Sequence, residues 1–168
     1  MLEKPESYYD IIAEAYPELH REEQLRKFRI ISSMISPKPG ETLLDVGCGP
    51  CYSAEVFKCF ITGVDPSVKL LEKAPRLPNL KLVRGYAEQL PFQDCSFDYV
   101  ISVTAIHNFS DIPRAVHEIW RVSKSLAVVS CLIRSKALGT VKRELSKRFT
   151  IEKQIVEGRD IIFLLKKV

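Results

Sequence analysis

The segment that decides the fold is Thr42-Leu-Leu-Asp-Val-Gly-Cys-Gly49, in which a short apolar run ends at closely spaced glycines. Such a run is typical of a buried strand, and the residues after it are expected to form a helix. Glycine allows a tight turn and lets the backbone approach a ligand closely. The free amides at the start of the helix favour electron-rich groups. This segment therefore predicts a ligand-binding loop between a strand and a helix.

Short apolar runs and amphipathic stretches alternate along the rest of the chain, a pattern typical of a parallel sheet with helices on both faces. Strands are predicted at 42–46, 60–64, 80–84, 97–103, 126–133, 150–156 and 160–167. Helices are predicted at roughly 6–15, 21–36, 52–59, 67–74, 111–122 and 135–148. The turn Glu157-Gly158-Arg159 is short, so the last two strands should form an antiparallel hairpin.

The composition is that of an ordinary globular protein, with 168 residues, 46% hydrophobic and 27% charged. These values exclude a disordered or fibrous chain and fit one domain. No apolar run approaches the roughly 18–20 residues of a membrane helix, and the polar, acidic start lacks the pattern of a signal peptide. Five cysteines without framework spacing favour a reducing compartment. We therefore expect a cytoplasmic protein without a membrane segment.

An acidic residue at the end of the second strand indicates the kind of ligand. Asp65 follows Gly47 by 18 residues, a position from which a carboxylate can accept hydrogen bonds from both ribose hydroxyls. The dinucleotide fingerprint requires a third glycine at 52, where this chain has Tyr52. Asp45 also puts negative charge where a phosphate would lie and suits a cationic ligand end instead. The sequence predicts a nucleoside site; the alternative is a tight turn with a solvated aspartate.

The chain resembles the class I S-adenosylmethionine-dependent methyltransferases, most closely the type-11 group, from about residue 7 to its end. The motifs that match are Leu-Leu-Asp-Val-Gly-Cys-Gly-Pro (43–50), Gly-Val-Asp-Pro-Ser (63–67), Gly-Tyr-Ala-Glu-Gln-Leu-Pro-Phe (85–92), Ser-Phe-Asp-Tyr-Val (96–100) and His107-Asn-Phe. The resemblance implies a Rossmann-like, seven-stranded, mostly parallel sheet of order 3-2-1-4-5-7-6, with strand 7 antiparallel. It also implies a single domain over 1–168, with a helical lid at 1–37 and a catalytic core at 38–168.

The resemblance also implies the cofactor, S-adenosyl-L-methionine, with S-adenosyl-L-homocysteine as product, and a role for each matching residue. The residues on the methionine and ribose side are Asp45, Gly47, Cys48 and Gly49, with Asp65 on the ribose hydroxyls. The residues near the adenine are Pro66, Ser67, Ala87 and Glu88. Thr104 would lie under the methionine, and Tyr16, with Tyr8 and Tyr9, matches the lid helix.

This sequence departs from the family pattern at two positions. Cys51 stands where the family often has a third glycine, and Tyr86 stands where an aspartate commonly reaches the adenine amino group. The second change predicts the loss of one adenine contact, which stacking by Tyr86 could replace. Cys48 and Cys51 form a Cys-x-x-Cys, but no second pair follows at zinc-ligand spacing, so no metal site is predicted.

His107 and Asn108 follow the fourth strand at the open end of the sheet and are the candidate catalytic residues. A histidine can act as a general base near neutral pH without a large pKa shift. The alternative is that both residues only pack or order their loop. The family's Asn/Asp-Pro-Pro-Tyr/Phe motif is absent after this strand, which disfavours several nucleobase and glutamine methylations.

Positive charge gathers in the last part of the chain, where 134–168 holds 10 of the 25 Lys and Arg residues and 4 of the 21 Asp and Glu residues. Lys136, Arg143 and Lys147 fall on one face of the predicted helix at 135–148, which is either an RNA-contacting surface or a plain solvated face.

No separate recognition domain is visible, so a large substrate or a partner subunit is expected. Related subunits that modify tRNA, ribosomal RNA or release factors work with a small zinc-binding activator.

Three functions remain open from the sequence. The first is methylation of RNA or a translation factor, and the second is methylation of a small molecule. The third is a catalytically silent S-adenosylmethionine-binding scaffold subunit, suggested by Tyr86 and by the missing motif after the fourth strand. A nicotinamide-dependent enzyme is a weaker rival.

Overall fold

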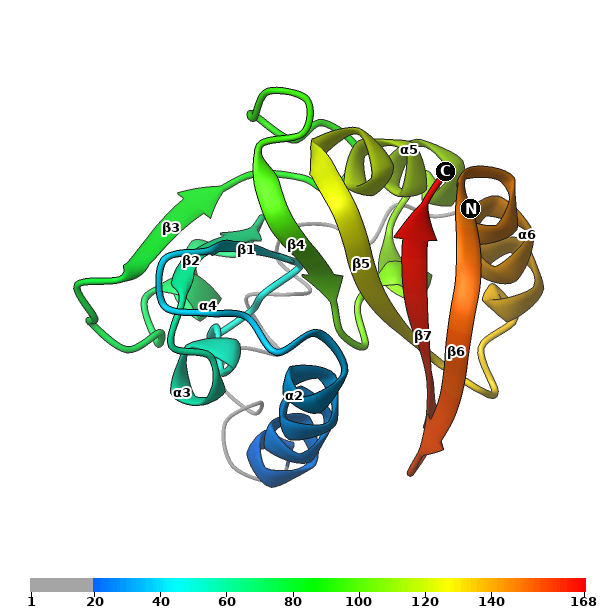
Figure 1. The fold of residues 1–168 in the computed structure, drawn as a ribbon. Helices are drawn as coiled ribbons and strands as arrows, with labels where there is room; N and C mark the ends of the chain where they lie inside the picture. Colours follow the sequence, from blue (N-terminus) through cyan, green and yellow to red (C-terminus); the bar gives the residue numbers. More distant parts are fainter. Residues whose placement is uncertain (1–19) are drawn as a thin grey trace.

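The computed structural model describes residues 20–168, which form a seven-stranded sheet of order β3-β2-β1-β4-β5-β7-β6 (Figure 1). The strands are β1 (Thr42–Val46), β2 (Phe60–Asp65), β3 (Leu80–Arg84), β4 (Phe97–Ser102), β5 (Ser123–Leu132), β6 (Phe149–Glu157) and β7 (Asp160–Lys167). The first five pair in parallel, whereas β7 runs antiparallel to both β5 and β6. The predicted order, the antiparallel strand and the final hairpin are confirmed.

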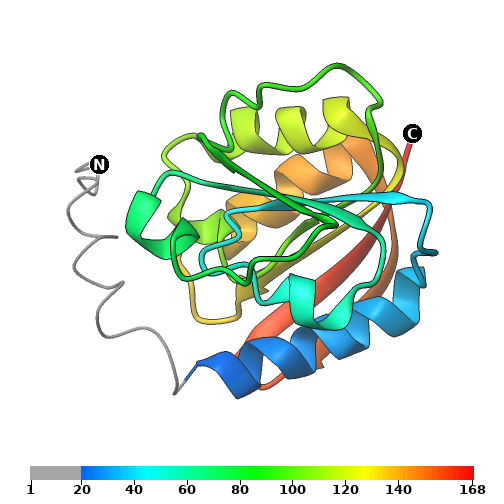
Figure 2. The same cartoon turned by 90° about the vertical axis from the view of Figure 1, so that its left-hand side faces the viewer.

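The described helices cover both faces of this sheet. They are α2 (Arg21–Ile35), α3 (Ser53–Val56), α4 (Val68–Leu71), α5 (Ile112–Val122) and α6 (Leu138–Arg148), with a 3-10 helix, η1 (Ile106–Asn108). Figure 2 shows α2 and α3 on one side of the sheet and α5 and α6 on the other. The predicted helix at 6–15, like Tyr16 and the other lid tyrosines, lies outside the described residues.

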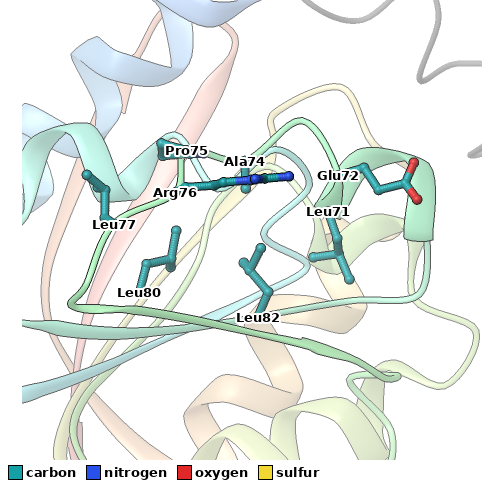
Figure 3. Close-up of a pocket in the computed structure, with 8 residues that line it drawn as sticks. All are labelled: Leu71, Glu72, Ala74, Pro75, Arg76, Leu77, Leu80 and Leu82. Carbon is teal, nitrogen blue, oxygen red and sulfur yellow. The ribbon is translucent and has the colours of Figure 1, made fainter.

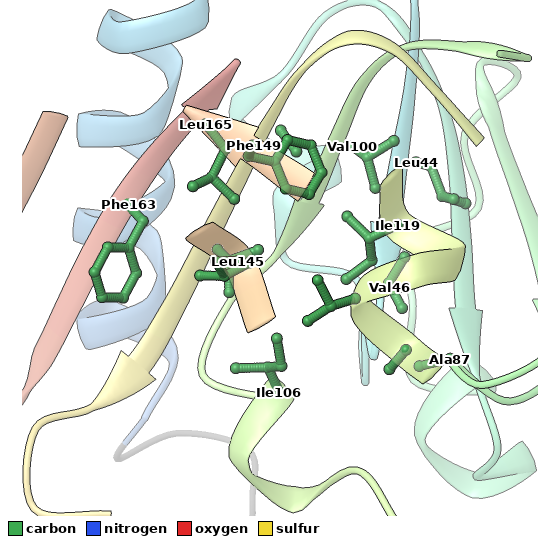
Figure 4. Close-up of a cluster of buried hydrophobic side chains, with 14 of the residues drawn as sticks. Leu44, Val46, Ala87, Val100, Ile106, Ile119, Leu145, Phe149, Phe163 and Leu165 are labelled. Carbon is green, nitrogen blue, oxygen red and sulfur yellow. The ribbon is translucent and has the colours of Figure 1, made fainter. Parts of the chain in front are cut away.

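Successive side chains of β1 point to opposite faces of the sheet and belong to two hydrophobic clusters, one on each face. Leu43 packs with Phe28 and Ile31 on the α2 side. Leu44 packs with Ile119 and other side chains of α5 and α6 on the opposite side (Figure 4). A parallel sheet covered on both faces needs nearly continuous apolar strands, which is why the apolar runs located the strands so well.

Helix α2 belongs to the packed body of the fold, since Ile31 is completely buried against the sheet. The division into a lid at 1–37 and a core at 38–168 depends on residues beyond those described and stays a prediction. Within residues 20–168, no helix combines the length and the apolar character needed to cross a membrane.

Candidate active site

Backbone hydrogen bonds hold the loop after β1 against β2, and the conformation of this loop requires glycine. The amides of Gly47 and Cys48 donate to the carbonyl of Val64 at 2.8 and 3.0 Å. Gly47 has φ +71° and Gly49 has φ +53°, both in the left-handed region that favours glycine. A Cβ atom on Gly47 would lie 2.7 Å from the Cβ of Ala105. The segment after β4 is therefore seated directly against the glycine loop.

Asp65 joins the glycine loop to the start of α4. One oxygen of its carboxyl group accepts the Gly49 amide at 2.9 Å, and the other accepts the Ser67 amide at 2.9 Å. Ser67 in turn caps α4, because its hydroxyl accepts the Leu70 amide at 3.2 Å. Burial raises the pKa of Asp65. A carboxylate oxygen has about two acceptor sites, so each oxygen keeps capacity for a ligand hydroxyl.

Asp45 is the second buried carboxyl group of the site. It is 1% exposed and accepts the Ser53 hydroxyl at 2.6 Å, which links β1 to α3. Burial raises its pKa from the ordinary 3.8 to about 7, and the charge of Asp65 acts in the same direction. A cation placed beside it would lower the pKa again and favour the charged form. The two carboxyl groups thus lie near the carboxyl ends of the adjacent strands β1 and β2.

We expect Asp45 to make the protein less stable as the pH rises from about 4 to about 7. Because its folded-state pKa is raised to about 7, the folded state holds a proton that the unfolded chain has already lost. The stability that it contributes is fully present below the ordinary pKa and is lost as the pH rises through 7. Urea unfolding of the protein and of Asp45→Asn, measured from pH 4 to 8, tests this difference. Parallel pH profiles for the two proteins would contradict it.

Two of the predicted adenine-side residues, Ala87 and Glu88, lie in the segment after β3, whereas Pro66 and Ser67 follow β2. Ala87 is buried in the core, whereas Tyr86 is 49% exposed. The Glu88 carboxylate accepts the amide and the hydroxyl of Ser110 at 2.8 and 3.0 Å, and the amide of Asp111 at 3.3 Å. Glu88 therefore holds this segment against the N-terminus of α5. A groove of about 530 Å³ runs beside it, lined by Arg84, Gly85, Tyr86, Glu88, Gln89, Leu90, Pro91, Ser110 and Arg114.

Thr104 lies where β4 ends, in a left-handed conformation with φ +54°. Its hydroxyl donates to Asp160 at 2.7 Å and accepts from Lys27 at 3.0 Å.

His107 and Asn108 follow in η1, so the structure brings both candidate catalytic residues to the same end of the sheet as the glycine loop. Lys27 and Asp160 were missed by the sequence interpretation. The sequence feature that could have indicated Lys27 is its inward-facing position on the amphipathic helix predicted at 21–36.

The two cysteines of the glycine loop are buried thiols packed against β2. Cys51 has φ +54°, so it adopts the conformation of the glycine that it replaces. A Cβ on Gly63 would meet the sulfur atoms of Cys48 and Cys51 at 2.8 and 3.0 Å. Burial raises the pKa of Cys48 well above its ordinary value. Among residues 20–168, no group of three or more His, Cys, Asp or Glu side chains is placed to hold a metal ion.

The basic face predicted for 135–148 is only partly formed. The helix begins at Leu138, so Lys136 lies in the turn before it and the helical spacing does not apply to this residue. Arg143 and Lys147 are on the helix, and both pair with the Glu144 carboxylate, at 3.2 and 2.8 Å. Their charges are therefore partly compensated locally.

A second groove, of about 830 Å³, lies beside β3 at one edge of the sheet (Figure 3). It is lined by Leu71, Glu72, Ala74, Pro75, Arg76, Leu77, Leu80 and Leu82. Most of these side chains are apolar, and the outer backbone edge of β3 pairs with no other described strand. The groove combines an apolar floor with an open sheet edge.

Residues 44–131, about half of the chain, match the family described as a methyltransferase domain. The chain belongs to this family. Among relatives, an uncharacterized protein of Methanocaldococcus jannaschii is 34% identical over 119 residues, which are 70% of this chain and 46% of the relative. The demethylmenaquinone methyltransferase of Staphylococcus epidermidis is 37% identical over 112 residues, which are 61% of this chain and 46% of the relative. The chain thus spans about half the length of these relatives.

Solved methyltransferase structures share the fold. A putative methyltransferase from an antibiotic biosynthesis pathway of Anabaena variabilis has a TM-score of 0.60 at 29% identity, over 64% of this chain and 45% of that one. A putative methyltransferase of Haloferax volcanii, solved in complex with the Trm112 methyltransferase activator, has a TM-score of 0.80 at 13% identity, over 99% of both chains. The resemblance inferred from the motifs is confirmed for family and fold.

Membership in this methyltransferase family implies S-adenosylmethionine as the cofactor. The residues around the glycine loop fit that molecule. Asp65 keeps acceptor capacity for ribose hydroxyls, and Asp45 is a buried carboxyl group that a cationic group would stabilise in its charged form. The left-handed glycines leave the backbone open to a close approach.

Proposed function

We propose that this protein transfers a methyl group from S-adenosylmethionine to an acceptor that binds at the carboxyl ends of β1 and β4. The observation that supports this best is the pair of buried carboxyl groups, Asp45 and Asp65, at the ends of adjacent strands around a left-handed glycine loop. Open parallel sheets bind ligands at this edge, where the strand order reverses. Here β1 lies between β2 and β4, so the reversal falls at the glycine loop.

In this proposal each carboxyl group binds a different end of the cofactor. Asp65 accepts the ribose hydroxyls, and Asp45 pairs with the cationic methionine end, while Pro66, Ser67 and Ala87 line the adenine side. The sulfonium of the cofactor supplies the reactive methyl group when it is bound. The task of the chain is then alignment, which can lower a barrier by roughly 7–11 kcal/mol at best.

His107 and Asn108 are proposed to face the acceptor. Both lie in η1, immediately after the segment that contacts Gly47 through Ala105. A base is needed only when the acceptor atom carries a proton that must leave before or during attack. We propose His107 for that step, with Asn108 orienting the acceptor by hydrogen bonding.

The acceptor class that we favour is RNA or a translation factor, modified together with a partner subunit. Support comes from the Haloferax volcanii protein, which matches this chain over nearly its whole length and was solved with an activator. Lys136, Arg143 and Lys147 are the candidate RNA contacts, with the side chains of Arg143 and Lys147 more than half exposed. A small-molecule acceptor is the second candidate, since the named relatives include a demethylmenaquinone methyltransferase.

Transfer of a radiolabelled methyl group from S-adenosylmethionine into fractionated cell extract tests the activity and the acceptor together. The fractions are separated by nuclease, protease and size. Label in a nuclease- or protease-sensitive fraction is expected, whereas label in small solutes would move the assignment to a small molecule. Binding of S-adenosylhomocysteine without any transfer would favour a silent scaffold subunit instead.

The groove beside β3 is the surface that we propose for the partner subunit. An open strand edge can pair with an extended segment of another chain, and neighbouring apolar pockets hold its alternate side chains. Leu77 is 39% exposed at this groove, and Leu80 and Leu82 extend the apolar lining along the strand. An extended apolar strand of a small activator subunit therefore fits this edge.

Leu77→Asp is expected to abolish association with a co-expressed zinc-binding activator, because it places a charge in the apolar groove. Val156→Asp is the matched control, since Val156 is 64% exposed on β6, at the opposite edge of the sheet. Size-exclusion chromatography of each co-expressed pair measures complex formation. Loss of the complex in both variants, or in neither, would contradict an interface at β3.

A further inference from the structure

A lysine and an aspartate are completely buried together between α2 and the start of β7. The side chains of Lys27 and Asp160 are both 0% exposed, and their charged atoms are 3.0 Å apart. The Lys27 ammonium also reaches Thr104 at 3.0 Å and Glu23 at 3.1 Å. An ammonium has three donors, and here each of them has an acceptor. A buried ion pair often stabilises a fold no more than apolar residues of similar volume would. We therefore looked for a role of this pair in fixing local geometry.

Lys27 and Asp160 both form hydrogen bonds with Thr104. The second oxygen of Asp160 accepts both the Thr104 hydroxyl, at 2.7 Å, and the Ser130 hydroxyl, at 2.8 Å. The Thr104 amide donates to the Ser130 hydroxyl at 2.8 Å. Side chains from α2, β5 and β7 thus fix both the backbone and the side chain of one residue.

Thr104 needs this support because of its backbone conformation. Its φ of +54° is unfavourable for a β-branched residue. The conformation turns the chain at the end of β4, and the next residue, Ala105, then lies against Gly47. A buried hydrogen-bond network that holds one unfavourable conformation fixes how the β4 segment meets the glycine loop.

We propose that Lys27, Asp160 and Ser130 are positioning residues that hold Thr104 and Ala105 against the glycine loop, and so set the affinity for the methionine end of the cofactor. This inference rests on the proposed function, because it assumes that S-adenosylmethionine binds at this loop. It predicts an effect on the amino-acid end of the ligand and none on the adenosine end, which lies toward β2 and β3.

The test compares two threonines that both donate a hydroxyl hydrogen bond to an aspartate. Thr104 donates to Asp160 at 2.7 Å, and Thr42 donates to Asp98 at 2.9 Å at the opposite end of the strands. Thr104→Val is expected to weaken binding of S-adenosylhomocysteine about tenfold, the order expected when a buried hydrogen bond is lost. Binding of 5′-methylthioadenosine, which lacks the amino-acid end, should change less than about twofold. Thr42→Val should leave both affinities unchanged.

Two further variants make the outcome decisive. Thr104→Ser keeps the hydroxyl and is expected to retain the original affinity for S-adenosylhomocysteine. Ser130→Ala removes the acceptor of the Thr104 amide and should repeat the selective loss if Thr104→Val does not fold. Equal losses for both ligands, or equal losses in Thr104→Val and Thr42→Val, would overturn the inference. Failure of the unmutated protein to bind S-adenosylhomocysteine would overturn the proposed function itself, a distinct result.

Discussion

Asp65→Ala is expected to weaken binding of S-adenosylhomocysteine by about a hundredfold or more. The carboxyl group accepts the amides of Gly49 and Ser67, both at 2.9 Å, and its remaining acceptor sites are those proposed for the ribose. A hydrogen bond to a charged group contributes about 1.5–3 kcal/mol, so the loss of two or more accounts for an effect of this size. Isothermal titration calorimetry measures the affinity directly.

Asp98→Ala is the matched control for this experiment. Asp98 also accepts a backbone amide, that of Thr42, at 2.9 Å, but it lies at the start of β4, at the opposite end of the strands. Its removal should leave the affinity within about twofold, since the hydrogen bonds that it makes do not reach the glycine loop. An Asp65→Ala variant that binds as tightly as Asp98→Ala would refute the assignment of the ribose site.

The strands could be predicted from the sequence because their signal is local. Each is a short apolar run bounded by turn residues, and burial on both faces of the sheet makes that run nearly continuous. The helices α3 and α4 came out shorter than the predicted stretches 52–59 and 67–74. At α4 one cause is visible in the sequence, since Pro75 disfavours helical conformation at Ala74.

The polar side chains of the site were harder to predict, because their partners are distant in the sequence. The position of Glu88 at an adenine edge stays a prediction, but its contact with Ser110, 22 residues away, could not be predicted from the sequence. Lys27 and Asp160 are 133 residues apart, and neither belongs to a recognised motif. Motifs identify residues that meet a common ligand, whereas contacts between elements depend on how the whole sheet packs. The local motif therefore located the glycine loop, but no motif located the network that holds Thr104.

Lys27→Met is expected to lower the free energy of unfolding by about 3–5 kcal/mol, the range for removing one partner of a buried ion pair. Among residues 20–168, the side-chain donors left to the completely buried Asp160 carboxylate would be the hydroxyls of Thr104 and Ser130. Urea unfolding followed by circular dichroism measures the loss. The double variant Lys27→Met with Asp160→Asn should be less destabilised than the sum of the single changes, because the second change removes the unpaired charge.

Lys124→Met separates the effect of burial from that of simply losing a lysine–aspartate pair. The Lys124 ammonium lies 2.7 Å from Asp98, closer than Lys27 lies to Asp160, but the two side chains are 48% and 28% exposed. Solvent screens such a pair, so its loss should lower the free energy of unfolding by about 1 kcal/mol or less. Equal effects of Lys27→Met and Lys124→Met would mean that water reaches Asp160 in the folded protein. The network around Thr104 would then lack the rigidity that the positioning role requires.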